Sequence, residues 1–474
     1  MALIIPGVEV KVVKEVLAPQ LAPSGVLGLV GLVENPAKGV GRAASWRSFI
    51  DGFGAASAFS LPEAAQALGN GVFELVVCPV ACDSYASVSI PAASGKAFTL
   101  TARAPGPWGN GLQVSIATRE VSTGQKDDKG NDLTRTVFDL TVRYAGSDYK
   151  EVHRNLSADA ADTQRNLADV LATQSQTLTV KEARTALKTP KDSPDVSSAG
   201  AAPYSLAGAT DADADAYRKA LAQLENESDV DMVLVSVQDK KDVARLSRIY
   251  ADVVSHCDRM SARSQGRIGF GEVPGSAAAD IATNADKLTG ALVSDRFILT
   301  APGGVVGAVA GMTGSLDYFQ SPTFKRLSGL GDPSPALGVE AQQELLRKNV
   351  VPIVSQRGRG IIVLRGLTTD GDQISVRRVA DHAVRGVKTI GELFIGRLNN
   401  EEGRGALKQK LVEFLVQMQK EGAIVPSTDG TDPAFKVNVY SSQQDFAQGI
   451  VRVDMAVRPV RAIDYIYATV LVQV

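Results

Sequence analysis

Apolar and polar residues alternate near both ends of the chain. Near the start, in PGVEVKVVKEV, charged residues separate Val8, Val10 and Val12. At the end, in YIYATVLVQV, every even position is apolar, including Val470, Val472 and Val474. A period of two residues is typical of a β-strand with one buried face. Both termini are therefore predicted to form strands, although chain ends usually carry little pattern.

The pattern between the ends changes several times along the chain. VLGLVGLV and FELVVCPV are unbroken apolar runs, as expected of strands buried on both faces. WRSFIDGFG predicts a short helix, and SLPEAAQALGNG predicts another, with Ser60 and Glu63 at capping-box spacing and Pro62 in the first turn. Over 207–391 helical and buried-strand patterns alternate, which indicates α/β layers.

Two further segments have patterns of their own. Alternating runs such as FDLTVRY, with the polar hairpin tip STGQKDDKGND, predict a mostly β insertion exposed at a surface. Near the end, GALKQKLVEFLVQMQKEG places Leu407, Leu411 and Leu415 on one helical face. AFKVNVY and VRVDMAVR follow with period two, and they predict an antiparallel ribbon whose apolar positions include Val437, Val439, Val451 and Val453.

We therefore predict an α/β and α+β multidomain protein. The expected domains are a strand arm and linker over 1–20, the N-terminal part of the core over 21–93, the mostly β insertion over 94–205, a central α/β layered domain over 206–390, and a small α+β domain over 391–474 that ends in a strand arm.

Composition and charge exclude several classes of partner. The 474 residues include 50 basic and 52 acidic ones, well mixed, so the chain has no electrostatic footprint for nucleic acid. The stretch 297–316 has no charged residue, but Pro302 and several glycines favour a buried strand, turn and loop over a membrane span. MALIIPGVEV lacks the regions of a secretory signal, so we expect synthesis and folding in the cytoplasm, without membrane insertion.

Candidate chemistry is sparse. His153, His256 and His382 lie in no metal-ligand spacing, and the chain has no GxSxG elbow, phosphate loop or GxGxxG. TDADADAY resembles the start of a calcium loop, but the required glycine and glutamate are alanines, so its aspartates are predicted to cap a helix. No catalytic, cofactor-binding or metal site is therefore predicted.

The three cysteines leave two interpretations open. Cys78, Cys82 and Cys257 are an odd number, so they imply no closed disulfide framework, and CPVAC is not a metal knuckle. They are either buried or idle thiols, or they form an intermolecular disulfide in an assembly that later leaves the reducing cytosol.

The order of motifs resembles the tail sheath proteins of contractile phages and related contractile injection systems. The resemblance rests on PGVEVKVVKE, VLGLVGLVENPAKG, WRSFIDGFG and NGVFELVVCPV, then PGPWGNGLQVSI at the start of the insertion, then ISVRRV and GRLNNEEGRGALKQKLVEFLVQMQKEGAI. It extends over most of the chain and is weakest in the insertion. AGATDADADAY stands where such proteins often have a glycine-rich turn, and thiols at Cys78 and Cys82 depart from the family pattern.

The resemblance implies a structural, non-enzymatic subunit without cofactors. Its copies would polymerise around an inner tube and contract to drive the tube through a target cell envelope. Expected partners are other copies, the tube protein, and baseplate and tail-terminator proteins. The chain would be made in the bacterial cytoplasm and become part of a virion tail or an injection-system particle.

The resemblance also implies roles for particular residues. The arms with Val8, Val10, Val12, Val470, Val472 and Val474 would add strands to the sheet of a neighbouring subunit, and Val437, Val439, Val451 and Val453 would belong to the receiving sheet. Pro19, Pro23 and Gly25 would form an elbow between arm and body. Arg404 and Lys408 are candidates to face the tube, although a solvated helix face explains them as well.

Two alternatives remain at this point. One is a non-contractile capsid or surface-layer protein, which would also polymerise. The other is a hydrolase on the central α/β domain, in which Asp231, His256 and a serine would have to converge.

Overall fold

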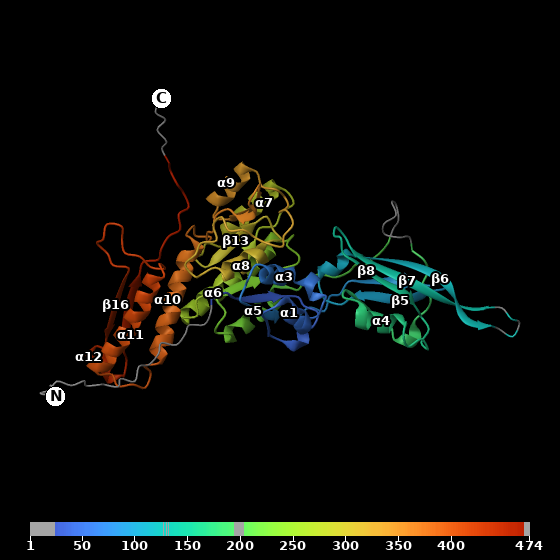
Figure 1. Ribbon diagram of the computed structural model, residues 1–474, viewed down its shortest axis with the longest axis horizontal. Helices are drawn as coiled ribbons and strands as arrows, with labels where there is room; N and C mark the ends of the chain where they lie inside the picture. The colour runs from blue at the N-terminus through green and yellow to red at the C-terminus, as the bar shows by residue number, and fades with distance from the viewer. Residues whose placement is uncertain (1–23, 127, 129, 131, 194–202, 469–474) are drawn as a thin grey trace, which may run out of the picture. The chain divides into compact units, whose positions relative to one another are not determined.

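The structure is a computed structural model that describes residues 24–126, 128, 130, 132–193 and 203–468. The predicted arm positions Val8, Val10, Val12, Val470, Val472 and Val474 lie outside the described residues. The described chain divides into two compact units, which we call the body and the C-terminal unit. The body is Ser24–Arg378 together with the described residues from Arg461 on, and the C-terminal unit is Val379–Val460. Figure 1 labels many of their elements.

The body is built on an eight-stranded sheet in the order β15-β14-β13-β12-β11-β1-β3-β2. The six central strands are parallel, and the edge strands β2 and β15 are antiparallel to their neighbours. The two apolar runs predicted as buried strands are β1 and β3, which confirms that prediction. The strands are β1 (Val26–Gly31), β2 (Gly41–Ala43), β3 (Glu74–Pro79), β11 (Met232–Val235), β12 (Ile268–Glu272), β13 (Phe297–Ala301), β14 (Val351–Gln356) and β15 (Gly360–Val363).

Helices cover both faces of this sheet, so the body has two apolar cores. Apolar side chains of one set of helices reach one core, and those of the other set reach the second. The first set is α5 (Ala214–Gln223), α6 (Val243–Ala262), α7 (Ala278–Thr289) and α9 (Val339–Arg347). The second is α1 (Trp46–Phe53), α3 (Pro62–Gly69), α8 (Val306–Ser315) and the start of α10 (Ile374–Glu392), with the short α2 (Ser57–Ser60) between α1 and α3. The prediction of α/β layers is confirmed.

The stretch 297–316 is only partly as predicted. Its first part is the buried strand β13, but its glycine-rich second part forms the helix α8 instead of a loop, and every residue from Val306 to Gly314 is buried. Gly307 and Gly311 face α3, because a Cβ built on Gly311 would lie 2.3 Å from the carbonyl oxygen of Ala67. Tertiary packing therefore favours a helix despite its glycines. No helix among the described residues is long and apolar enough to cross a membrane.

The predicted capping box of Ser60 and Glu63 is wrong. The Ser60 hydroxyl donates to the Leu32 carbonyl oxygen at 2.8 Å, and α3 begins after Leu61 without a side-chain cap. The buried Glu63 carboxylate instead accepts a hydrogen bond from the Ser236 hydroxyl at 2.7 Å. Because both side chains form hydrogen bonds with residues distant in the sequence, the capping box does not form.

The segment that follows β3 carries two further sheets. One has the order β4-β5-β9 and the other β10-β6-β7-β8. They share a separate apolar core that includes Phe98, Phe138 and Leu171, and the long β6–β7 hairpin is plain in Figure 1. The elements are β4 (Ser87–Pro91), β5 (Lys96–Ala102), β6 (Leu112–Lys126), β7 (Asp132–Tyr144), β8 (Lys150–Leu156), α4 (Leu167–Gln174), β9 (Leu178–Val180) and β10 (Tyr204–Ser205).

The C-terminal unit contains most of α10, then α11 (Glu401–Lys420), β16 (Phe435–Tyr440), α12 (Gln443–Ala447) and β17 (Arg452–Val457). The predicted apolar face of α11 is confirmed at Leu407, Leu411 and Leu415, which are buried. The predicted antiparallel ribbon is β16 and β17, with Val437 opposite Met455 and Val439 opposite Val453.

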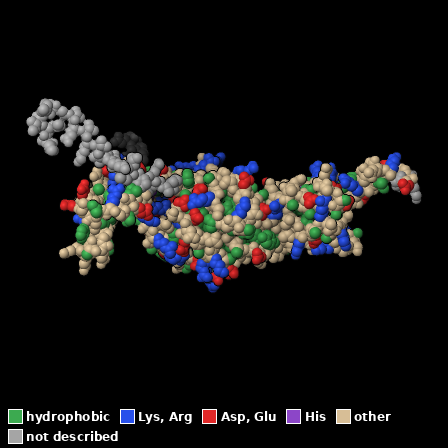
Figure 2. Space-filling view, turned by 90° about the horizontal axis from the view of Figure 1, so that it is seen from below, with side chains coloured by type: hydrophobic (Ala, Val, Ile, Leu, Met, Phe, Trp, Pro, Cys, Tyr) green, Lys and Arg blue, Asp and Glu red, His purple; other side chains and the backbone are tan. Residues whose placement is uncertain are grey.

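Charged side chains are mixed over the described surface. Figure 2 shows basic and acidic side chains close together on one face. Arg42 illustrates the pairing, because it donates to Glu74 and to Asp229 at 2.7 Å each. Most of these pairs are partly exposed and add little stability singly.

Candidate functional site

The β16–β17 ribbon of the C-terminal unit is an open sheet with one apolar face. Within the described residues it pairs with no third strand. Val437, Val439, Val451 and Val453 pack against the cluster of Ile390, Leu407 and Leu411. The valines are only half buried, while the residues between them along the strands are exposed. A two-stranded sheet of this kind is marginal alone, and its open edges can pair with another chain.

Hydrogen bonds fix the turn between the two strands. Arg452 donates from Nε and Nη2 to the carboxylate oxygens of Asp445 at 2.8 and 2.7 Å. The Asp445 carboxylate also accepts from the Ser442 hydroxyl at 2.7 Å, at the start of α12. These bonds, the one from Arg452 above all, hold the pKa of Asp445 well below its usual range. The start of β17 is therefore tied to α12.

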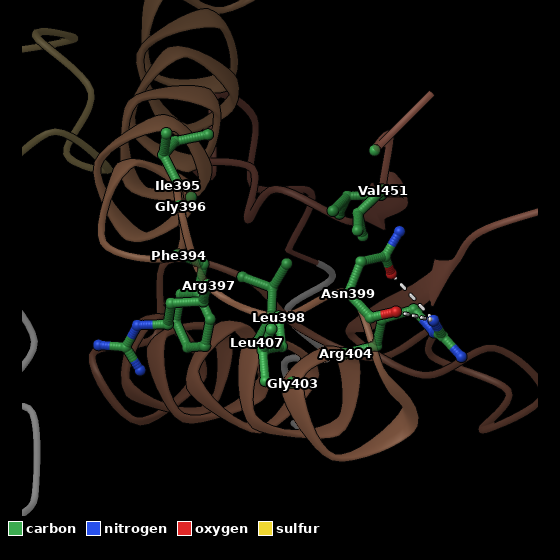
Figure 3. A pocket seen from close by; sticks show the side chains of 13 residues that line it. Phe394, Ile395, Gly396, Arg397, Leu398, Asn399, Gly403, Arg404, Leu407 and Val451 are labelled. Atoms are coloured by element: carbon green, nitrogen blue, oxygen red, sulfur yellow. Dashed lines mark hydrogen bonds between the residues drawn. The ribbon is translucent and has the colours of Figure 1, made fainter. Parts of the chain in front are cut away.

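A pocket of about 340 Å³ lies beside the ribbon in the same unit. Its apolar wall includes Phe394, Leu407 and Val451, which Figure 3 shows around the opening. Ile395 and Leu398, on the loop between α10 and α11, are 82% and 79% exposed. Large apolar side chains exposed beside an apolar pocket indicate a protein contact surface.

An asparagine holds this loop in place. Arg404 Nη1 donates to the Asn399 carbonyl oxygen at 3.2 Å and to Asn399 Oδ1 at 2.9 Å (Figure 3). Asn399 Nδ2 in turn donates to the Ser441 hydroxyl at 3.2 Å. Asn399 is not among the residues predicted from the sequence. Its neighbour Asn400 caps α11 by accepting from Gly403 N at 2.8 Å. Two asparagines before an apolar helical run are a typical signal for a helix start, and they could have drawn attention to this loop.

The two candidates for facing a tube have different surroundings. Arg404 is half buried and bonded to Asn399, so its guanidinium positions the loop. Lys408 lies one turn further along α11 and is exposed. Only Lys408 is therefore placed with its side chain open to a partner.

The predicted elbow does not include Gly25. The Gly25 N–H donates to the Asp231 carboxylate at 2.9 Å, and a Cβ on Gly25 would lie 2.3 Å from the Gly314 carbonyl oxygen. Its φ of +105° suits glycine alone. Gly25 is thus packed into the body and cannot act as a free joint. Pro19 and Pro23 lie outside the described residues.

The cysteines differ in exposure. Cys78 and Cys257 are fully buried, and burial raises the pKa of the Cys78 thiol to about 12. Cys82 is partly exposed, although burial still raises its pKa. A disulfide to another chain through Cys78 or Cys257 would require the body to open, so the second interpretation, an intermolecular disulfide, would involve Cys82 alone.

The residues proposed for a hydrolase do not form a catalytic site. The Asp231 carboxylate accepts from Gly25, as described above. His256 is fully buried on α6, and its Nε2 accepts from Arg267 Nη1 at 2.8 Å. Burial and the guanidinium of Arg267 lower the pKa of His256 to about 3, so it cannot serve as a general base with this nitrogen.

The aspartates Asp211 and Asp213 of the acidic run 211–215 have structural roles. Asp213 caps α5 by accepting from Ala216 N at 2.7 Å, as predicted. Asp211 accepts from the Tyr217 hydroxyl at 2.8 Å and from Arg245 at 3.1 Å. Among the described residues no group of three or more His, Cys, Asp or Glu is placed to hold a metal ion.

The low pKa of His256 predicts a loss of stability in mild acid. The unfolded chain takes up a proton near pH 6.5, whereas the folded chain resists it down to about pH 3. Stability from this group is therefore full above pH 6.5 and falls as the pH drops, by about 2 kcal/mol at pH 5. Urea unfolding of the chain and of His256→Gln at pH 7.5 and 5 measures this, and the variant should lose about 2 kcal/mol less. Equal losses would contradict the assignment.

Comparison with known proteins connects this geometry to a family. A family model described as the phage tail sheath protein central domain matches residues 207–369. A second, described as the phage tail sheath C-terminal domain, matches residues 368–473. Together they extend over more than half of the chain. No curated protein sequence matches it.

Solved structures share the fold along nearly the whole chain. The sheath tail protein Lin1278 from Listeria innocua has a TM-score of 0.52 at 16% identity, covering 94% of each chain. The contracted helical sheath of the anti-feeding prophage has a TM-score of 0.53 at 14% identity, covering 99% of each chain. The contracted PVC sheath complex of an extracellular contractile injection system has a TM-score of 0.55 at 11% identity, covering 99% of this chain and 98% of its own.

Proposed function

The chain belongs to the phage tail sheath family and is a structural, non-enzymatic subunit of a contractile tail or injection-system particle, and we propose that its copies join through their terminal arms. In this proposal, the arms with Val8, Val10, Val12, Val470, Val472 and Val474 leave one subunit and add strands to the β16–β17 ribbon of others. Main-chain hydrogen bonds supply the affinity, and the alternating side chains set the register.

The observation that carries this proposal is that the β16–β17 ribbon is a two-stranded sheet with a half-buried apolar face. Its valines are half buried and it has no third strand within the described residues. The sequences at both termini have the same period of two residues and offer apolar side chains for the same face. A two-stranded ribbon is only marginally stable by itself. Arms from other copies would add strands to it and bury its valines further.

The proposal also includes contraction of the polymer that the arms link. The free energy is stored when the extended sheath assembles, and contraction exchanges one set of subunit contacts for a better-packed set without any nucleotide. The two compact units, the body and the C-terminal unit, would move as blocks while the arms stay paired. Since Gly25 is packed into the body, the elbow expected from the sequence would be limited to Pro19 and Pro23.

The remaining partners are assigned on the same basis. The polymer would surround an inner tube and end at baseplate and terminator proteins, and helical sheath and baseplate assemblies occur among the structures of similar fold. Lys408 would face the tube, with Arg404 behind it positioning the loop at Asn399. Co-sedimentation of the sheath with its tube protein at low and high salt tests the Lys408 contact, because an exposed charge contact weakens as salt is added.

The proposed function predicts that the purified chain forms tubes of regular diameter. Negative-stain electron microscopy and sedimentation over a range of protein concentrations measure this. Tubes should form above a threshold concentration, with no nucleotide, metal or nucleic acid added. A chain that stays monomeric at all concentrations, with and without its tube protein as a template, would contradict the proposal. Closed shells or flat sheets in place of tubes would support a capsid or surface-layer protein.

A further inference from the structure

Residues 461–464 are held against residues 365–373 of the body, the unit to which they also belong, by side-chain hydrogen bonds. The chain enters the C-terminal unit after Arg378 and belongs to the body again from Arg461 on. From there to residue 468 it forms no strand. Nevertheless, side chains near the start of α10 and after β15 hold it in place. We call this set the arm latch; it consists of Arg365, Asp372, Gln373, Arg461, Ala462 and Asp464.

The amide of Gln373 pairs with the backbone of Ala462 as a neighbouring strand would. Gln373 Nε2 donates to the Ala462 carbonyl oxygen at 3.0 Å, and the Ala462 N–H donates to Gln373 Oε1 at 2.9 Å. The Gln373 side chain is buried, being only 6% exposed. Both backbone groups of Ala462 are therefore satisfied by one side chain that is 89 residues away in the sequence.

The carboxylate of Asp464 is the buried anchor of the latch. Its side chain is 6% exposed, and Oδ2 accepts from Arg365 Nε and from Gln373 Nε2 at 2.9 Å each. A buried carboxylate is costly unless a cation and hydrogen bonds compensate it, and Arg365 supplies the charge. Displacement of the segment would leave the guanidinium of Arg365 and the amide of Gln373 without this carboxylate partner. Arg461 adds a more exposed pair with Asp372 at 2.6 Å.

The residues beyond the anchor are exposed. Tyr465 is 63% exposed, with the guanidinium carbon of Arg365 5.2 Å from its ring centroid, and Ile466 and Tyr467 are 83% and 95% exposed. The chain thus changes after Asp464 from a segment held by hydrogen bonds to one that makes none of the latch bonds, although Ile463 within the held segment is also 78% exposed. This change coincides with the start of the predicted C-terminal arm.

We propose that the arm latch fixes where the C-terminal arm leaves the body, so that the arm reaches another copy in one register and transmits force to the start of α10. The inference rests on the proposed function, because it gives the arm its role. Gln373 lies next to Ile374, the first residue of α10, so a pull on the arm would act where that helix begins. Arg365, Gln373 and Asp464 are positioning residues in this scheme.

The test compares three variants of the full chain with the wild type. Asp464→Ala removes the anchor, and Asp464→Asn keeps its size and an acceptor but not its charge. Asp432→Ala is the matched control, because Asp432 also accepts from an arginine, Arg458, at 3.0 Å, but its side chain is 49% exposed. Each variant is measured for thermal unfolding, for hydrogen exchange of the peptide that contains Ala462, and for tube assembly by sedimentation.

The expected results separate the latch from general stability. In Asp464→Ala monomers the Ala462 amide should exchange about tenfold faster, and the concentration for half assembly should rise about tenfold, which corresponds to about 1.4 kcal/mol. Asp464→Asn should lie between, and Asp432→Ala should match the wild type. The unfolding temperature should change little in all three.

Three results would overturn the latch. These are unchanged exchange at Ala462, faster exchange with unchanged assembly, or an equal assembly defect in Asp432→Ala. If Asp464→Ala does not fold, Asp464→Asn alone decides between the same outcomes. The exchange measurement is made on monomers, so failure of the wild type to form tubes would overturn the proposed function while the contact at Ala462 could still be seen.

Discussion

A chain that lacks residues 1–13, and one that lacks residues 465–474, are both expected to fold and to form no tubes. The described cores of the body and of the C-terminal unit contain none of these residues, so the unfolding temperature should stay close to that of the wild type. Each deletion removes a predicted strand that would complete the β16–β17 ribbon of another copy. Circular dichroism melts and sedimentation measure the two properties, and assembly should fall below detection at concentrations where the wild type is fully polymerised.

Point variants make this test sharper, because they keep the arm's length. Replacing Val8, Val10 and Val12 by serine removes the apolar face of the first predicted strand and should abolish assembly as the deletion does. The control replaces Glu9 and Lys11 by glutamine, which changes the opposite face of the same strand and should leave tubes intact. Normal long tubes from either deletion, or equal defects in both point variants, would contradict the role of the arms.

The second large effect is expected at Gly311, where α8 passes α3. Gly311→Ala would place a Cβ 2.3 Å from the carbonyl oxygen of Ala67, which belongs to the backbone of α3 at a buried residue. The two helices would have to separate within a packed core, which costs about 3 kcal/mol. Urea unfolding followed by intrinsic fluorescence or circular dichroism should show this loss.

The matched control for Gly311 is Gly405→Ala. Gly405 is also a helical glycine, but it lies on the exposed side of α11, and its added Cβ would meet nothing within 4 Å. There the better helix propensity of alanine should stabilise the chain by about 0.5–1 kcal/mol. Equal changes at the two positions would show that helix propensity, and not the contact between α3 and α8, governs the effect at Gly311.

The local patterns of the sequence predicted the α/β layers, the apolar face of α11 and the β16–β17 ribbon. These features depend on which residues are apolar and how they are spaced, and packing on a single sheet or helix preserves that spacing. Val437 and Val453 lie on the predicted face because the period of two residues is continuous through each strand. Asp213 caps its helix for an equally local reason.

Features that depend on distant partners were not predictable. Ser60 and Glu63 have the spacing of a capping box, but Leu32 and Ser236 take their side chains. The glycines of α8 indicate a turn until α3 is known to lie against them. The arm latch joins residues about ninety positions apart, and nothing near Gln373 in the sequence indicates that its amide bonds to Ala462. Tertiary contacts override local propensity in each case.

The most direct test of the account is a cryo-electron microscopy map of the assembled tube at side-chain resolution. We expect the β16–β17 ribbon of every subunit to carry additional strands from other copies, with Val8, Val10 and Val12 or Val470, Val472 and Val474 on its valine face. The C-terminal arm should leave the body at Asp464, still bonded to Arg365 and Gln373. A ribbon that remains two-stranded in the tube, with both arms folded back on their own subunit, would contradict the account.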